Sequence, residues 1–160
     1  AGITRHDRKV AEAALAKAAC TEAPAVAIEL NDGRIITGKT SDLLGASSAA
    51  LLNALKELGG INDNIPLISP NVIEPIQKLK VQHLGNHNPR LHTDEILIAL
   101  AIAATNNPVS HLAMQQLQKL KDCEVHSTVL LSEVDLSTFK KLGMNLTCEA
   151  KYQTKKLYHP

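Results

Sequence analysis

A strictly apolar run of nine residues, at positions 96–104, is the feature that most constrains how this chain can fold. The run reads ILIALAIAA, and a helix built from it has no polar face. Such a helix avoids water only inside a protein, so we expect it to be buried on most sides. A helix that crosses a bilayer needs about 20 apolar residues. The run therefore predicts a core helix rather than a membrane span.

The rest of the core must also be aliphatic, because aromatic residues are almost absent. Phe139, Tyr152 and Tyr158 are the aromatic residues of the chain, and Trp is missing. The 160 residues are 44% hydrophobic and 21% charged, an ordinary composition for one globular domain. Single-stranded nucleic acids are bound by stacking on aromatic rings, and duplexes by excess positive charge. With few aromatics and a net charge of +1, we expect no nucleic-acid partner and no membrane surface.

The three cysteines indicate a reducing compartment. Cys20, Cys123 and Cys148 are far apart in the sequence, and none belongs to a C-x-x-C pair. An odd number of scattered thiols fits a cytoplasmic protein better than a disulfide framework. The first residue is Ala1 rather than Met, and a helical pattern starts almost at once. We therefore expect one α/β domain over residues 1–160, the C-terminal part of a longer protein, although processing would explain the same start.

Hydrophobic periodicity and turn signals predict an alternation of helices and strands. The predicted helices cover residues 7–20, 47–58, 70–83 and 135–142, with a helical hairpin whose two helices begin at 93 and 108; the predicted strands cover 25–30, 35–37, 65–68, 124–131 and 145–149. The helix within residues 1–20 is expected to bridge to a preceding domain, and residues 151–160 to form a polar tail. Ser47 and Thr93 are the expected N-caps of their helices, and Asp32-Gly33 is the expected centre of a tight primed turn.

Five short strands interleaved with helices predict an α/β fold, a three-layer αβα sandwich with one mixed sheet. This order of elements is similar to the cytidine-deaminase-like topology. Zinc deaminases carry H-x-E at the start of the second helix and P-C-x-x-C at the start of the third. The matching places here read GASS from Gly45 and SPNVIE from Ser69, without His or Cys. Because the zinc ligands are missing, we expect no deamination, no metal and no cofactor.

The same two helix starts carry small polar residues that suit an anion. Free backbone N–H groups at a helix N-terminus bind phosphate or carboxylate, and Ser47, Ser48 and Asn71 lie at these starts. If both starts point at one spot, they form a ligand site. Simple capping is the commoner role of serine at a helix start, and it remains the alternative interpretation.

A second polar group lies in the loop that leads into the apolar helix. Asn88, Arg90, His92 and Asp94 combine a guanidinium fork for carboxylate or phosphate with an imidazole that moves protons near neutral pH. They are therefore candidate ligand-binding residues. The alternative is a structural role, because a loop that enters a core must satisfy its own backbone groups.

Three histidines near this loop, His83, His87 and His92, raise the question of a metal site. Metal ligands converge most readily from one regular element, and Gly85 and Pro89 interrupt any helix between these histidines. The motif H-E-x-x-H is also missing from the chain. Surface histidines on a loop are the favoured interpretation.

Three stretches read LISPNVIEPIQKLK, LGNHNPRLHTDEILIALAIAATNNP and CEVHSTVLLSEVDLSTFKKLGMNLTCEAKY. They resemble the C-terminal part of a bacterial family, the domain of unknown function 1846 family, and the resemblance extends from about residue 28 to residue 158. It implies a cytoplasmic bacterial protein with further domains before this one. Some members carry the label ATP-dependent zinc peptidase, but neither a P-loop nor a zinc-peptidase motif exists here. No catalytic residue is carried over.

The leading hypothesis for function is a domain for packing and oligomerisation. Its partners would be the preceding domains and further copies of the protein, and the loop over residues 88–94 would line a shared cleft. The alternative is an enzyme or nucleotide-binding domain that holds a phosphate-bearing ligand with Ser47, Asn71, Arg90 and His92. A hydrolase or peptidase comes third, because no motif in this chain supports it.

Overall fold

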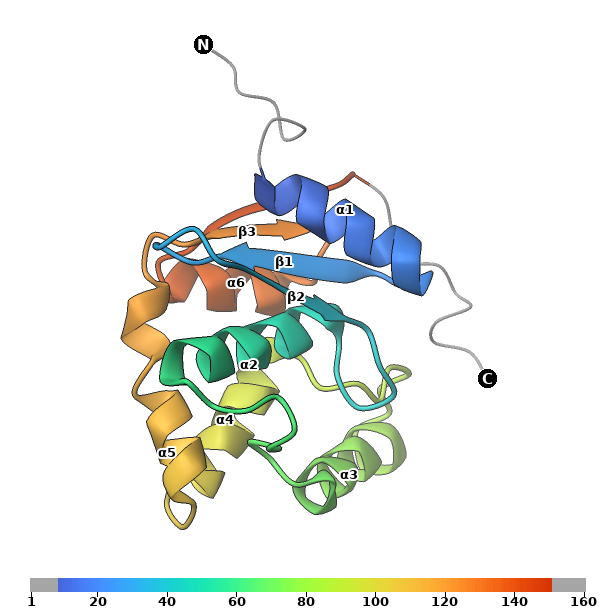
Figure 1. Cartoon of the computed structure of the whole chain (residues 1–160). Helices are drawn as coiled ribbons and strands as arrows, with labels where there is room; N and C mark the ends of the chain where they lie inside the picture. Colours follow the sequence, from blue (N-terminus) through green and yellow to red (C-terminus); the bar gives the residue numbers. More distant parts are fainter. Residues whose placement is uncertain (1–8, 151–160) are drawn as a thin grey trace.

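The computed structural model describes residues 9–150, which form a mixed sheet with helices on both faces (Figure 1). The α-helices are α1 (Lys9–Thr21), α2 (Ala46–Gly59), α3 (Pro70–Lys78), α4 (Thr93–Ala103), α5 (Pro108–Met114) and α6 (Glu133–Lys141). The strands are β1 (Ala25–Glu29), β2 (Ile35–Lys39), β3 (Glu124–Ser127) and β4 (Asn145–Cys148). A π-helical turn, η2 (Leu79–His83), extends α3, and a 3-10 turn, η3 (Leu117–Leu120), follows α5. The predicted α/β class is confirmed, whereas the predicted tail over 151–160 and the start of the first helix lie outside the described residues.

The sheet within the described residues has the strand order β2-β1-β3-β4. Strand β1 runs antiparallel to both β2 and β3, and β3 runs parallel to β4. A parallel pair needs a crossover connection, which α6 supplies between β3 and β4. The sheet is therefore mixed, as the order of elements predicted.

The predicted strand over residues 65–68 is wrong, because this segment is irregular. Leu67 and Ile68 are nevertheless buried and belong to the main core. Pro66 has no backbone N–H to offer a neighbouring strand. The Leu67 carbonyl accepts a hydrogen bond of 2.7 Å from the Ser110 hydroxyl instead. The apolar run signalled burial correctly, but burial alone does not distinguish a strand from a packed loop.

The helices are distributed unequally over the two faces of the sheet. Helix α1 packs on one face, against β1, β2 and β3, whereas α2 packs on the other face against β1 and β2. Helices α4 and α5 pack against α2 on the side away from the sheet, and α4 also contacts α6 (Figure 1). Both faces are covered, as predicted, but the side that carries α2 is two helices deep.

Strand β1 divides the buried residues between the two faces by simple alternation. Val26 and Ile28 point into the main core, which α2 covers. Ala27, between them, belongs to a small cluster with Val10 and Ala14 of α1. The side chain of Ala27 is short, so α1 can lie close to the sheet.

Helix α4 is buried on one side only, which corrects the expectation from its apolar sequence. Ile96 and Leu100 are fully buried, whereas Ile98 and Ile102 are 61% and 64% exposed. Ile98 and Ile102 are one turn apart and share a face with Ala101, which is also exposed. An aliphatic stripe of Ile98, Ala101 and Ile102 therefore remains uncovered in the described structure.

The turn between β1 and β2 also differs from the predicted geometry. Leu30 and Arg34 face each other across the turn, with Leu30 N–H donating to Arg34 O at 2.8 Å. The loop therefore holds three residues, 31–33, and only Gly33 has a positive φ, of 92°. A primed two-residue turn needs positive φ at both central residues, so it is excluded. Asp-Gly predicted the hairpin correctly but not its loop length.

Gly38 allows β2 and α2 to approach closely. A Cβ atom at this position would lie 2.2 Å from the backbone nitrogen of Ala50 and 2.6 Å from its Cα. These are backbone atoms of a helix, so they cannot move aside as a flexible side chain would. The site therefore requires glycine.

We predict that Gly38→Ala lowers the free energy of unfolding by about 1–3 kcal/mol or more, because it forces α2 away from the sheet. Chemical denaturation of the purified chain measures this change. Gly45→Ala is the matched control, since a Cβ there meets nothing closer than the Leu91 oxygen at 3.9 Å. Equal stability of the two variants would contradict this account of the α2 packing.

Candidate functional site

Three helices begin around one small cavity. It has a volume of about 40 Å³ and lies between the starts of α2, α4 and α6. The lining residues are Gly45, Ala46, Ser47, Asn88, Arg90, Leu91, His92, Val129, Leu131, Ser132 and Asp135. One water needs roughly 10–15 Å³ of such space. The cavity therefore has room for a small polyatomic group.

Leu91 fixes the position of the loop that separates two of these helix starts. It forms an isolated parallel bridge with Leu44, and its N–H donates to Leu43 O at 3.1 Å. Its carbonyl accepts hydrogen bonds from Gly45 N–H at 3.3 Å and from the Ser48 hydroxyl at 2.9 Å. The starts of α2 and α4 are therefore joined by backbone contacts.

The starts of α4 and α6 are capped by side chains. Asp135 accepts the Thr93 N–H at 3.0 Å and the Thr93 hydroxyl at 2.7 Å. Glu95 accepts the N–H of His92, the residue that precedes α4, at 2.8 Å. Ser132 Oγ in turn accepts the Asp135 N–H at 3.3 Å at the start of α6. Thr93 is therefore the first residue of α4 and not its N-cap, which corrects the prediction.

The start of α2 has no such cap. Its N-cap is Gly45 rather than the predicted Ser47, and no side chain accepts its first N–H groups. Ser47 lies within the first turn, is 2% exposed and lines the cavity. Its hydroxyl has no hydrogen-bond partner among the described residues. An uncapped helix start and an unpartnered hydroxyl therefore meet at the same cavity.

The loop on the other wall is held by Lys80, whose side chain is 2% exposed. The Lys80 ammonium donates to the Arg90 carbonyl at 2.6 Å and to Glu95 Oε1 at 2.7 Å. Glu95 also lies 3.3 Å from His92 Nδ1. This network joins η2, the loop and the first turn of α4. Neither Lys80 nor Glu95 was among the residues predicted for the site.

This network favours the charged forms of both Glu95 and His92. Burial raises the pKa of Glu95, but hydrogen bonds from His92 and Lys80 outweigh it and bring this pKa to about 2. The hydrogen bond to Glu95 in turn raises the pKa of His92 above its ordinary value of 6.5, against the opposing effect of burial. Glu95 is therefore a carboxylate at all physiological pH values, and His92 is protonated more readily than a free histidine.

The structure brings together four of the seven residues predicted for a ligand site. Ser47, Asn88, Arg90 and His92 all line the cavity. Asn88 Oδ1 accepts the Arg90 N–H at 3.0 Å, and Arg90 Nε donates to the Ser41 carbonyl. The loop side chains thus support their own backbone as well as lining the cavity.

The other three predicted residues lie apart from the cavity. Ser48 is buried, and its hydroxyl donates to the Leu91 carbonyl. Asn71 is exposed at the start of α3, and Asp94 is exposed on α4, where it accepts the Glu95 N–H. The starts of α2 and α3 do not meet at this cavity, which corrects that expectation. The start of α6 lies there instead.

Asp135 and Ser132 are the polar lining residues that sequence reasoning missed. The spacing of Ser132 and Asp135, S-x-x-D ahead of Leu136 and Phe139, is a helix-start signal close to a capping box. It places the start of α6 two residues before the predicted start at Asp135. The pattern contains no sign that Asp135 also caps a helix 42 positions away in the chain.

A shallow hollow of about 420 Å³ adjoins the cavity. Its lining residues are Gly85, Asn86, His87, Asn88 and His92, so it shares Asn88 and His92 with the cavity. His83 and His87 are exposed, while His92 faces Glu95. Residues 9–150 contain no group of three or more His, Cys, Asp or Glu side chains placed to hold a metal ion.

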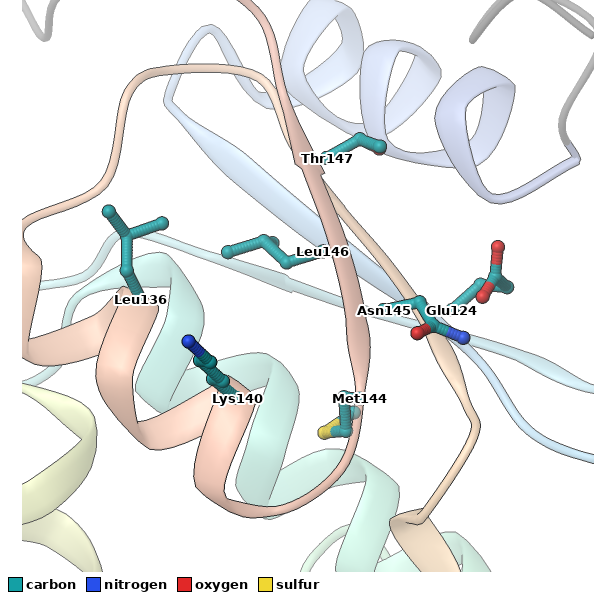
Figure 2. A pocket seen from close by; sticks show the side chains of 7 residues that line it. All are labelled: Glu124, Leu136, Lys140, Met144, Asn145, Leu146 and Thr147. Atoms are coloured by element: carbon teal, nitrogen blue, oxygen red, sulfur yellow. The ribbon is translucent and has the colours of Figure 1, made fainter.

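Another hollow, of about 450 Å³, lies between α6 and β4, the outermost described strand on that side of the sheet (Figure 2). Figure 2 shows Lys140 and Leu136 of α6 on one side of the β4 ribbon and the side chains of Glu124 and Asn145 on its other side. The two charged groups therefore do not converge on one point. This hollow is the groove beside a sheet edge and does not combine groups for chemistry.

One further polar cluster is buried under α1. His126 of β3 is fully buried, with Nδ1 2.7 Å from Thr147 Oγ1 and Nε2 2.6 Å from Glu149 Oε2. It faces Ala27 across the sheet, so it lies on the face that α1 covers. Both ring nitrogens are engaged, which fits a structural role.

Comparison with known proteins identifies relatives over almost the whole chain. The family model described as "Domain of unknown function DUF1846, C-terminal" matches residues 6–158. A UPF0371 protein of Corynebacterium glutamicum is 55% identical over 158 residues, which are 99% of this chain and 32% of that protein. UPF0371 proteins of Streptococcus uberis and Streptococcus thermophilus are 53% and 52% identical over 157 residues, in each case 98% of this chain and 32% of the relative. The chain thus spans about a third of the length of these relatives.

Among the described helices, none is both long enough and apolar enough to cross a membrane.

We predict that Glu95→Gln lowers the free energy of unfolding at pH 7 by about 3 kcal/mol, because it leaves the buried Lys80 ammonium without its carboxylate. The folded-state pKa of Glu95, about 2, lies below its ordinary 4.5. Its contribution is therefore complete above pH 4.5 and is lost as the pH falls toward 2. Thermal unfolding measured across this range should show wild type and Glu95→Gln converging in acid.

Asp94→Asn is the matched control for this measurement. Asp94 is the exposed neighbour of Glu95 and accepts only the Glu95 N–H in the described structure. Its replacement should change stability by less than about 0.5 kcal/mol. A difference between wild type and Glu95→Gln that stays constant from pH 7 to pH 2 would exclude the proposed ion pair as its cause.

Proposed function

This chain belongs to the family of the domain of unknown function DUF1846, C-terminal, and we propose that it acts there as a packing and oligomerisation domain of a larger bacterial protein. One observation carries this proposal, the exposed aliphatic stripe on α4. The partners proposed for the stripe are the preceding part of the same protein and further copies of it. The loop over residues 88–94 would line a cleft shared with that neighbour.

The stripe supports an interface because it exposes large apolar side chains where the solvent-facing side of a helix normally carries polar ones. Ile98 and Ile102 are each more than 60% exposed, and Ala101 lies between them on the same face. Contiguous apolar patches on soluble proteins commonly mark sites of protein contact. The opposite face of α4 is fully buried at Ile96 and Leu100, so the helix is apolar on both sides. A helix with two apolar faces fits a position between two packed bodies.

The length of the relatives agrees with this proposal. The chain matches 32% of each of the UPF0371 proteins named above, and its family model is described as C-terminal. Two thirds of those relatives therefore lie outside the matched part. Domains within one chain commonly bury about 600–1,500 Å² against each other. The exposed side of α4 is an apolar surface that suits such a contact.

The cysteines support a cytoplasmic location and give no support to thiol catalysis. Cys20, Cys123 and Cys148 are all free thiols. Burial raises the pKa of the Cys123 and Cys148 thiols, so both are protonated at neutral pH. Protonated thiols are poor nucleophiles, whereas structural cysteines of this kind are common in reducing compartments.

We predict that the double variant Ile98→Lys/Ile102→Lys abolishes self-association of the chain without unfolding it, because both side chains are already exposed to solvent. Native mass spectrometry and analytical ultracentrifugation measure the subunit number of wild type and variant. The wild type is expected to form an oligomer, and the variant to be a monomer with a melting temperature within a few degrees of wild type.

Leu84→Lys is the matched control, because Leu84 is as exposed as Ile102, at 64%, but lies outside α4. It should leave the subunit number unchanged. The full-length relatives provide the second arm, in which the same α4 variant should weaken the contact between this part and the rest of the protein. Unchanged assembly of both the chain and the full-length protein after the α4 substitution would overturn the proposal.

A further inference from the structure

We propose that the cavity at the start of α2 binds the phosphate group of a small ligand. The groups that carry this inference are the free backbone N–H donors of the first turn of α2 and the buried hydroxyl of Ser47. The site lies at the first turn of α4 and not on its exposed stripe, so it is independent of the packing function proposed above.

The first donors are backbone N–H groups that no other group within residues 9–150 accepts. The N–H groups at the start of an α-helix have no partner within the helix. Ala46, Ser47 and Ser48 are the first three residues of α2, and no described side chain or carbonyl accepts their N–H groups. The other two helix starts at the cavity have carboxylate or hydroxyl acceptors from Asp135, Glu95 and Ser132, as described above. Of these three residues, Ala46 and Ser47 line the cavity, so α2 presents unaccepted donors to it, and the helix dipole favours a negative charge there.

The second observation is independent of the helix start. The Ser47 side chain is 2% exposed, lines the cavity and leaves its hydroxyl without a hydrogen-bond partner in residues 9–150. An unpaired buried hydroxyl costs about 1–3 kcal/mol. A ligand oxygen in the cavity would accept this hydroxyl hydrogen together with the backbone N–H groups. The orphaned hydroxyl is therefore explained if the cavity normally holds an acceptor.

The remaining lining groups fit an anion better than a neutral ligand. Arg90 and His92 are the two basic side chains in the wall, and the hydrogen bond to Glu95 favours the protonated form of His92. Asp135 is the carboxylate in the wall, but it already accepts two hydrogen bonds from Thr93. Its carboxylate is therefore already hydrogen-bonded to the start of α4. The donors proposed for the ligand are therefore the backbone N–H groups of Ala46 and Ser47 and the Ser47 hydroxyl, and Arg90 and His92 add positive charge to the wall.

The size of the space favours a phosphate group over a larger anion. The cavity holds about 40 Å³, which suits a single tetrahedral group rather than a whole nucleotide. The adjoining hollow of about 420 Å³ shares Asn88 and His92 with the cavity wall. A phosphate ester would place its phosphate in the cavity and its organic part in this hollow, whereas free phosphate would use the cavity alone.

The test is a titration of the 160-residue chain followed by amide NMR spectra. Inorganic phosphate is added in one arm and glycerol 3-phosphate in the other, each against sodium chloride at matched ionic strength. Saturable shifts of the Ala46, Ser47 and Ser48 amide signals are expected with both probes. Tighter binding of glycerol 3-phosphate would identify an ester as the ligand, and equal affinity would identify free phosphate.

Gly45→Asp is the decisive variant, with Gly45→Ala as its control. Aspartate is a preferred N-cap, and its carboxylate would accept the same N–H groups from within the protein. Binding should weaken roughly tenfold or more in Gly45→Asp, while its melting temperature rises. Gly45→Ala adds the Cβ without the carboxylate and meets only the Leu91 oxygen, at 3.9 Å, so comparison of the two variants separates the effect of the carboxylate from that of the Cβ.

Ser47→Ala gives a second readout that does not depend on the helix cap. Loss of the unpartnered hydroxyl should weaken phosphate binding several-fold and leave the melting temperature of the free chain equal or higher. The proposal is overturned if phosphate does not shift the Ala46–Ser48 amides, or if Gly45→Asp and Ser47→Ala bind it as well as wild type. In that case the cavity is a solvent site.

Discussion

The buried ammonium of Lys80 holds together the part of the molecule on which the candidate site depends. Its side chain is 2% exposed, and it bonds to the Arg90 carbonyl and the Glu95 carboxylate. Taking an ammonium out of water is costly unless its partners are well placed. The pair is therefore stable only when η2, the loop and the first turn of α4 are all in position. Through Leu91 the same loop fixes the start of α2.

This arrangement explains why three helix starts can meet in one place. Each helix start carries a partial positive charge and N–H groups without partners in the helix. Bringing three such starts together is therefore unfavourable unless other groups accept hydrogen bonds from them. Asp135 satisfies α4 although it belongs to α6, and Ser132 satisfies α6 itself. Glu95 adds a second negative charge beside His92. The acceptors are shared between helices, so the start of α2 stands out as the one left unsatisfied at the cavity.

The sequence predicted local features well where neighbouring residues decide them. Gly60 ends α2 with a φ of 65°, Ser69 caps α3, and α5 begins at Pro108 as predicted. The failures come from contacts between distant residues. Thr93 looked like an N-cap, but its partner Asp135 lies 42 positions away, and the start of α2 is set by Leu91 rather than by a local serine. The hydrophobic periodicity of the sequence gives no information about these contacts.

The hydrophobic pattern of the sequence predicted the fold class but not which apolar side chains are buried. Alternating strand and helix patterns determine that a sheet is covered by helices, and four of the five predicted strands exist. The segment over residues 65–68 and the run over residues 96–104 were both read from hydrophobicity alone. Hydrophobicity indicates contact with something apolar but does not say whether that partner is present in the same domain. This is why the face of α4 at Ile98 and Ile102 was expected to be buried and is exposed.

Helix α4 connects the proposed packing stripe with the proposed ligand cavity. Its first turn, with Thr93 and Glu95, adjoins the cavity, and its later turns carry the stripe at Ile98 and Ile102. A helix of 11 residues moves as one body, so a neighbour packed on the stripe would fix the position of the first turn. None of the stripe residues lines the cavity or the adjoining hollow, so contact on the stripe does not itself fill either space. The proposed assembly and the proposed ligand binding can therefore coexist on one helix.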